Sequence, residues 1–141
     1  MKGFTLIEIL IVIAIVGLVL SFGMSIDLSA FKRNNFQAEE ATIVSVLERA
    51  RSHAMANLFD ADYGVCYIAP DYAIFRDGSC DGLGTDETIP ANINIAEHVD
   101  TVFPTVIFDQ LAGTTSGATI HIEDGIKEAD IKINEEGTIS W

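Results

Sequence analysis

Apolar residues dominate the beginning of the chain. From position 9 to position 20 nearly every residue is apolar, Gly17 apart. Residues 4–24 are long enough to cross a bilayer as a helix, which needs about 20 residues. Only Glu8 interrupts this stretch, and a carboxylate in a membrane segment costs several kcal/mol unless it has a partner or lies near an interface. The pattern predicts an apolar helix with one charge that needs an explanation.

After Met24 the apolar positions recur at helical spacing. They form one stripe, made up of Phe36, Ile43, Leu47, Ala50, Ala54 and Leu58. The charged residues of this segment lie mostly off the stripe: Glu39, Glu40, Glu48, Arg49 and Arg51. No proline precedes Pro70, so we expect a nearly continuous helix from about residue 4 to about residue 58, with Gly23 as its softest point. At 1.5 Å per residue this helix is roughly 80 Å long.

Beyond Asp60 the apolar period becomes strand-like. Segments 63–68 and 72–76 flank Ala69-Pro70-Asp71 and predict a hairpin. We also expect a half-exposed strand at 89–95, a buried strand at 105–108, and alternating strands at 118–122 and 129–133. Asn134 to Gly137 then turns the chain, and Ile139 and Trp141 close the last strand. Because the connections between the segments are short, we expect six or seven strands that pair mostly antiparallel. A long helix followed by such strands makes the expected fold class α+β.

Charge narrows the range of partners. The net charge is -13, with 8 Lys and Arg against 21 Asp and Glu. Because binding to phosphate backbones needs basic residues, we expect no nucleic-acid partner. Four of the eight basic residues, Lys32, Arg33, Arg49 and Arg51, lie on the predicted helix. The composition suits a soluble acidic head that stays dispersed, or one that meets a basic partner or a cation.

The two cysteines, Cys66 and Cys80, leave two interpretations open. Their spacing is not that of a C-x-x-C redox pair, and no further cysteines complete a zinc site. They form either a disulfide or two buried thiols. If the domain lies outside the cytoplasm, the disulfide is favoured.

Two ordinary explanations of the N-terminal segment, a secretory signal peptide and a plain membrane anchor, fit it poorly. In a secretory signal peptide, Lys2 is the basic end, but the acid at position 8 is out of place and no small-x-small cleavage site follows cleanly. For a plain membrane anchor, the positive-inside rule decides little, since Lys2 lies on one side and Lys32 and Arg33 on the other.

The segment Gly3-Phe4-Thr5-Leu6-Ile7-Glu8 resembles the processing signal of type IV prepilins and type II secretion pseudopilins. The resemblance implies cleavage between Gly3 and Phe4 by a prepilin peptidase and N-methylation of Phe4. It also implies that Glu8 pairs during assembly with the new amino group of a neighbouring subunit. The implied partners are the peptidase, other pilins or pseudopilins in a filament, and the inner-membrane assembly platform. The implied location is the inner membrane, as a single-pass protein with a periplasmic or extracellular head, and then the filament.

The resemblance also implies a division of the chain. We expect a leader at residues 1–3, a transmembrane and filament-core helix at 4–25, its amphipathic continuation at 26–59 and a β-rich globular head at 60–141. A long N-terminal helix followed only by strands is similar to the pilin architecture. The run Ala50-Arg51-Ser52-His53-Ala54 and a chain end of the form Ile131-x-Ile133-x-x-x-Gly137-x-Ile139 resemble H-type (FimT-like) minor pseudopilins.

Three other patterns give only weak indications of a metal-binding or catalytic site. The segment 77–87 is similar to a calcium loop, but Thr88 stands where the bidentate glutamate belongs, so an acidic, glycine-rich turn is preferred and no cofactor or metal is expected. His53, His98 and His121 are scattered and are expected at the surface. In residues 113–117 the serine is one place late for a nucleophile elbow, and no pattern indicates an enzyme.

The sequence thus predicts a structural, and by its small head a minor, subunit of a type IV pilus or type II secretion pseudopilus. The alternative is a membrane-tethered binding module whose head recognises a partner protein or a surface.

Overall fold

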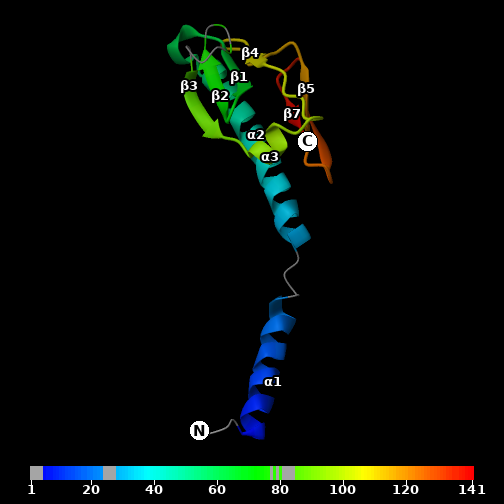
Figure 1. Ribbon diagram of the computed structural model, residues 1–141. Helices are drawn as coiled ribbons and strands as arrows, with labels where there is room; N and C mark the ends of the chain where they lie inside the picture. The colour runs from blue at the N-terminus through cyan, green and yellow to red at the C-terminus, as the bar shows by residue number, and fades with distance from the viewer. Residues whose placement is uncertain (1–4, 24–27, 77, 79, 81–84) are drawn as a thin grey trace. The chain divides into compact units, whose positions relative to one another are not determined.

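A computed structural model describes residues 5–23, 28–76, 78, 80 and 85–141 (Figure 1). The chain divides into two compact units, Met1–Arg33 and Asn34–Trp141, which we describe separately. Its architecture is α+β, as predicted, with N-terminal helices followed by antiparallel sheets.

The first unit contains helix α1, Leu6–Gly23. Among the described residues, no helix combines the length and the apolar character that a membrane span requires. Continuity between α1 and the next helix depends on residues 24–27, so the prediction of one unbroken helix lies outside the described residues.

Helix α2 spans Leu28–Met55 and carries the predicted stripe into the second unit. Its buried apolar members include Phe36, Ile43, Leu47, Ala50 and Ala54. The helix ends earlier than predicted, because Asn57 adopts a left-handed conformation at φ 55°. Asparagine tolerates this conformation better than most residues, which makes it a common helix terminator.

The prediction that Leu58 is the last member of the apolar helical stripe is therefore wrong. Leu58 belongs to a short 3-10 helix, η1 (Leu58–Asp60), and its side chain is half-exposed rather than part of the core.

The first sheet is built on the predicted hairpin. Strands β1 (Tyr63–Ile68) and β2 (Asp71–Arg76) pair antiparallel, with β3 (Thr85–Pro90) beside β2 and β4 (Val106–Phe108) beside β1. The sheet order is β3-β2-β1-β4, and each neighbouring pair is antiparallel.

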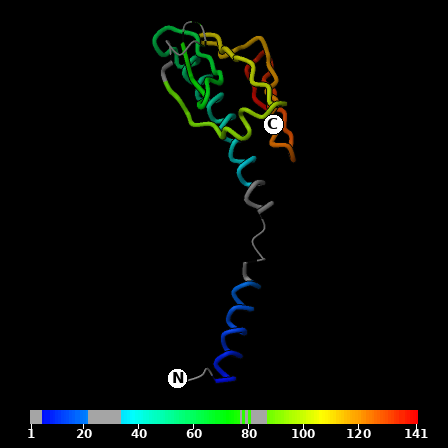
Figure 2. Tube along the Cα trace, in the orientation of Figure 1, coloured from blue at the N-terminus to red at the C-terminus, as the bar shows by residue number. Residues whose placement is uncertain are grey.

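The second sheet has the order β5-β6-β7 and is also antiparallel. Its strands are β5 (Ala118–Glu123), β6 (Glu128–Ile133) and β7 (Ile139–Ser140). Figure 2 shows the end of the chain running back beside β6. The described residues thus hold seven strands, in agreement with the predicted number and direction.

The predicted strand at 89–95 is wrong. Pro90 ends β3, and Ile93–Ala96 form a short helix, α3. The Asn92 side chain accepts a 3.2 Å hydrogen bond from the Asn94 N–H, which favours a helical turn over a strand. Of the alternating isoleucines, Ile95 is buried while Ile93 is half-exposed.

Two smaller predictions also need correction. Strand β4 was expected to be fully buried, but it buries Val106 and Phe108 and exposes Ile107, as an edge strand with one covered face does. Trp141 was expected to close the last strand, but it follows β7 and is exposed.

One hydrophobic core joins α2 to both sheets. It includes Ile43 and Leu47 from α2, Val65, Ile74 and Phe108 from the first sheet, and Ile120, Ile122 and Ile131 from the second. Burial of each large aliphatic side chain stabilises the fold by about 1.5–3 kcal/mol.

Candidate functional site

Helix α1 presents apolar side chains on all sides. Successive residues of a helix point about 100° apart, and almost every residue from Ile9 to Leu20 is apolar. Most of these side chains are more than half exposed, such as Leu18 at 59% and Val19 at 64%. A helix that is apolar all round requires an apolar environment on every side, either lipid or other helices.

Glu8 is the only charged residue of α1 and lies in its first turn. The Thr5 carbonyl oxygen accepts backbone hydrogen bonds from the N–H groups of Glu8, at 3.1 Å, and Ile9, at 3.3 Å. The helix dipole favours a carboxylate at this end. The predicted cleavage position between Gly3 and Phe4 lies outside the described residues.

The head buries one carboxylate that the sequence pattern did not predict to be buried. Glu39 was placed off the apolar stripe, but its side chain is only 5% exposed. Its Oε1 accepts hydrogen bonds from the Tyr72 hydroxyl at 2.6 Å and from the Asn92 N–H at 3.0 Å. Burial, and then the hydrogen bond to Glu39, raise the pKa of the Tyr72 hydroxyl. A signal was present, since Glu39 is three residues after Phe36 and four before Ile43, on the same helical face.

Arg51 joins α2 to two loops of the head. Its Nε donates to the Gly113 carbonyl oxygen at 3.4 Å, and its guanidinium donates to the Glu136 carbonyl oxygen at 3.0 Å. Gly137 follows with φ +74°, and a Cβ there would overlap the Gly113 carbonyl oxygen. The residues quoted for the H-type resemblance thus include one anchoring contact of the head.

Cys66 and Cys80 form a disulfide with a Cα–Cα distance of 6.2 Å. Cys66 lies in a small buried cluster with Ala73 and Phe75. In the chain-entropy treatment of the unfolded state, closing a loop this short stabilises by about 3 kcal/mol.

The segment 77–87, which is similar to a calcium loop, lies largely outside the described residues, which omit Asp77, Ser79 and residues 81–84. Glu87, the acid nearest to the position of the missing bidentate ligand, forms an ion pair with Arg49.

The structure separates one histidine from the other two. His53 lies edge-on to the Tyr63 ring, with 5.3 Å between ring centroids. His98 and His121 both lie partly exposed beside the same acid, Glu123. The histidines are scattered along the sequence, and only the pairing of distant segments brings His98 and His121 together.

Comparison with known families identifies the N-terminal segment. Residues 1–24 match the family described as the prokaryotic N-terminal methylation motif, which is the signal of type IV prepilins and pseudopilins. Comparisons with curated proteins and with solved structures give no match.

Proposed function

We propose that this chain, which carries the type IV prepilin and pseudopilin signal at residues 1–24, is a structural subunit of a type IV pilus or a type II secretion pseudopilus. The observation that carries the proposal is the order of the parts. The methylation motif includes a helix that is apolar on all sides, and α2 and a β-rich head follow it.

The proposed sequence of events begins at the inner membrane. A prepilin peptidase cleaves between Gly3 and Phe4 and methylates the new amino group of Phe4. The segment 4–25 anchors the subunit in the membrane, and the head lies on the periplasmic or extracellular side. Because lipid tails and apolar side chains solvate this helix about equally, its transfer into a bundle of like helices leaves its apolar surface covered throughout.

Glu8 is proposed to set the axial register in the filament. The amino group of Phe4 is a cation, and a neighbouring Glu8 supplies the opposite charge. In the low dielectric of a helix bundle, an unpaired charge is costly, so registers that leave either group alone are disfavoured.

The small head favours a minor subunit, and the resemblance to H-type pseudopilins points in the same direction. In the filament the helices form the core and the acidic heads face outward. The net charge of -13 keeps heads apart from one another except where specific contacts or cations join them.

The first experiment is the intact mass of the protein extracted from membranes, together with sequencing of its N-terminal peptide. Cells with an active prepilin peptidase are expected to yield a chain that starts at Phe4 and carries one added methyl group. A Gly3→Val variant in the same cells is the matched control and is expected to keep Met1.

Two results contradict the proposal. A wild-type chain that still begins at Met1 in these cells is a plain membrane anchor, and a chain cleaved beyond Leu20 is a secreted β domain. A correctly processed chain that never enters filament fractions favours the alternative, a membrane-tethered binding module.

A further inference from the structure

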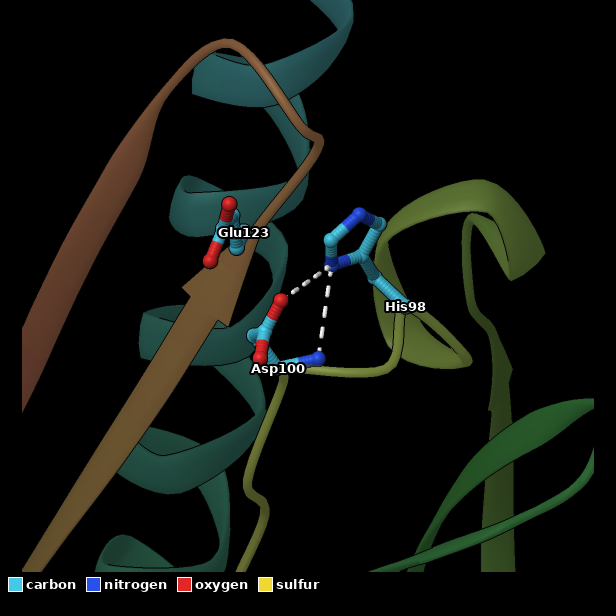
Figure 3. A group of neighbouring side chains, drawn as sticks. All are labelled: His98, Asp100 and Glu123. Atoms are coloured by element: carbon cyan, nitrogen blue, oxygen red, sulfur yellow. Dashed lines mark hydrogen bonds and ion pairs between the residues drawn. The ribbon is translucent and has the colours of Figure 1, made fainter.

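Three potential metal ligands converge at one end of the second sheet. His98 and Asp100 lie on the segment after α3, and Glu123 is the last residue of β5. One ligand atom from each lies within 4.8 Å of the other two. Figure 3 shows the His98 and Asp100 side chains directed toward one another, with Glu123 beside them.

Hydrogen bonds that do not involve these side chains hold the two segments together. The Thr101 hydroxyl donates to the Ile95 carbonyl oxygen at 2.7 Å and accepts from the Glu123 N–H at 3.0 Å. Val102 and His121 exchange backbone hydrogen bonds of 2.8 and 3.0 Å. The three ligands are therefore placed by the backbone and are not held together by their own attraction.

The His98 ring faces Asp100 through its Nδ1. Its Nδ1 accepts a 3.4 Å hydrogen bond from the Asp100 N–H, a long contact that a metal ion bound at this nitrogen would replace. The Asp100 Oδ2 lies 4.0 Å from the same nitrogen. Neutral imidazole nitrogen is the form that coordinates metal ions.

The basic neighbours of these carboxylates are histidines, since His98 Nδ1 lies 4.0 Å from Asp100 Oδ2 and His121 lies near Glu123. Among the described residues, no lysine or arginine forms an ion pair with Asp100 or Glu123, and the acid Glu128 lies opposite Glu123 on β6. Like charges gathered without a counter-ion repel one another, and a bound cation relieves that repulsion.

We propose that His98, Asp100 and Glu123 form a binding site for a divalent transition-metal ion of the Zn²⁺ type. Mixed nitrogen and oxygen ligands suit zinc, whereas calcium prefers oxygen alone. Bond lengths of about 2.0–2.2 Å at a tetrahedral ion place neighbouring ligand atoms about 3.4 Å apart. The 4.0 Å separation of the His98 and Asp100 atoms closes to this value by a small rotation of the exposed Asp100 side chain. Water supplies the remaining ligand.

A second group, His121, Glu123 and Glu128, shares Glu123 and is the competing location. His121 Nδ1 lies 2.7 Å from Asp130 Oδ1, so an ion bound at Nδ1 would break this hydrogen bond, whereas an ion bound at Nε2 would keep it. The ion is placed at His98, where only a 3.4 Å hydrogen bond has to be displaced, and the His121→Gln variant tests the other location.

The test is a titration of the full chain in detergent, stripped of metal with a chelator and then dialysed. Calorimetry with Zn²⁺ measures affinity and stoichiometry, and visible absorption with Co²⁺ reports the ligand set. The variants are His98→Gln, Asp100→Asn and Glu123→Gln, with His121→Gln and His53→Gln as matched controls. Asp100 is well exposed, so its variant is expected to fold even if another does not.

Wild type is expected to bind one Zn²⁺ per chain. Removal of a residue that only hydrogen-bonds to a metal ligand weakens metal binding about 10- to 100-fold. Each variant that removes a ligand itself is therefore expected to weaken Zn²⁺ binding by at least that factor. The His121→Gln and His53→Gln variants are expected to bind as wild type does.

Three results overturn the proposal. The first is the absence of stoichiometric Zn²⁺ binding to wild type. The second is loss of binding in His121→Gln together with retention in His98→Gln. The third is calcium binding as tight as zinc binding and unchanged in His98→Gln. None of these results bears on N-terminal processing, so the metal site and the proposed function fail independently.

Discussion

The Tyr72 hydroxyl on β2 donates a 2.6 Å hydrogen bond to Glu39 Oε1 on α2, and both side chains are buried. The same oxygen accepts from the Asn92 N–H at 3.0 Å, between β3 and α3. One carboxylate therefore ties the helix to the sheet and to the segment where the predicted strand at 89–95 gives way to a helix. Apolar packing alone tolerates small slips of a helix along a sheet, whereas this directional contact specifies one position.

Replacement of Tyr72 by Phe is expected to destabilise the head by about 1–3 kcal/mol, because it removes a donor from a buried carboxylate. The matched control is Tyr67→Phe, which removes a 3.0 Å hydrogen bond to Glu97 from an exposed position. Thermal or urea unfolding of the full chain in detergent measures both changes. Equal losses in the two variants would show that burial of Glu39 does not matter.

Replacement of Gly137 by Ala is expected to cost about 2–5 kcal/mol, the sum of a left-handed backbone penalty and a steric overlap. Gly137 has φ +74°, and its Cβ position overlaps the Gly113 carbonyl oxygen that also accepts from Arg51. Gly117→Ala is the control, since Gly117 has a similar φ of +77° but its nearest neighbour is 3.5 Å away. We expect it to cost only about 1–2 kcal/mol. Denaturant midpoints compare the two, and a Gly137→Ala protein as stable as Gly117→Ala contradicts the steric argument.

The hydrogen bond to Asp130 raises the pKa of His121 above its usual 6.5, with nearby acids adding to the effect and burial opposing it. Because the folded pKa is the higher one, the resulting stabilisation is fully present below the unfolded pKa. It is lost as pH rises through the folded pKa. NMR titration of the His121 ring protons in chelator-treated buffer measures this pKa. In Asp130→Asn it is expected to fall back toward 6.5, and an unchanged value would assign the shift to other acids.

Replacement of Glu8 by Ala is expected to leave membrane insertion and processing intact and to reduce incorporation into filaments. An uncompensated buried charge costs about 3–5 kcal/mol, which corresponds to a loss of about 100-fold or more. The measurement is the amount of this subunit in purified filaments relative to its amount in membranes. Glu48→Ala removes one exposed charge from α2 and is the control. Normal assembly of the Glu8→Ala protein would remove the proposed role of Glu8.

The sequence by itself determined the features that depend only on which residues follow one another along a short stretch of chain. The methylation signal at residues 1–24 is a linear pattern, and the apolar stripe of α2 and the alternation of β5 and β6 follow from the period of the backbone. At 89–95 the same reasoning failed. Short apolar alternation fits a strand or a helical turn, and the Asn92 cap decided between them.

Only the tertiary structure decided which distant residues meet. Glu39 looked like a solvent-facing acid until Tyr72 and Asn92 came to lie beside it. His98 and Glu123 are far apart along the chain, and they are neighbours because Val102 pairs with His121. Local sequence sets the period of each element, but such contacts depend on how the elements pack on a shared core, which no short stretch of sequence contains.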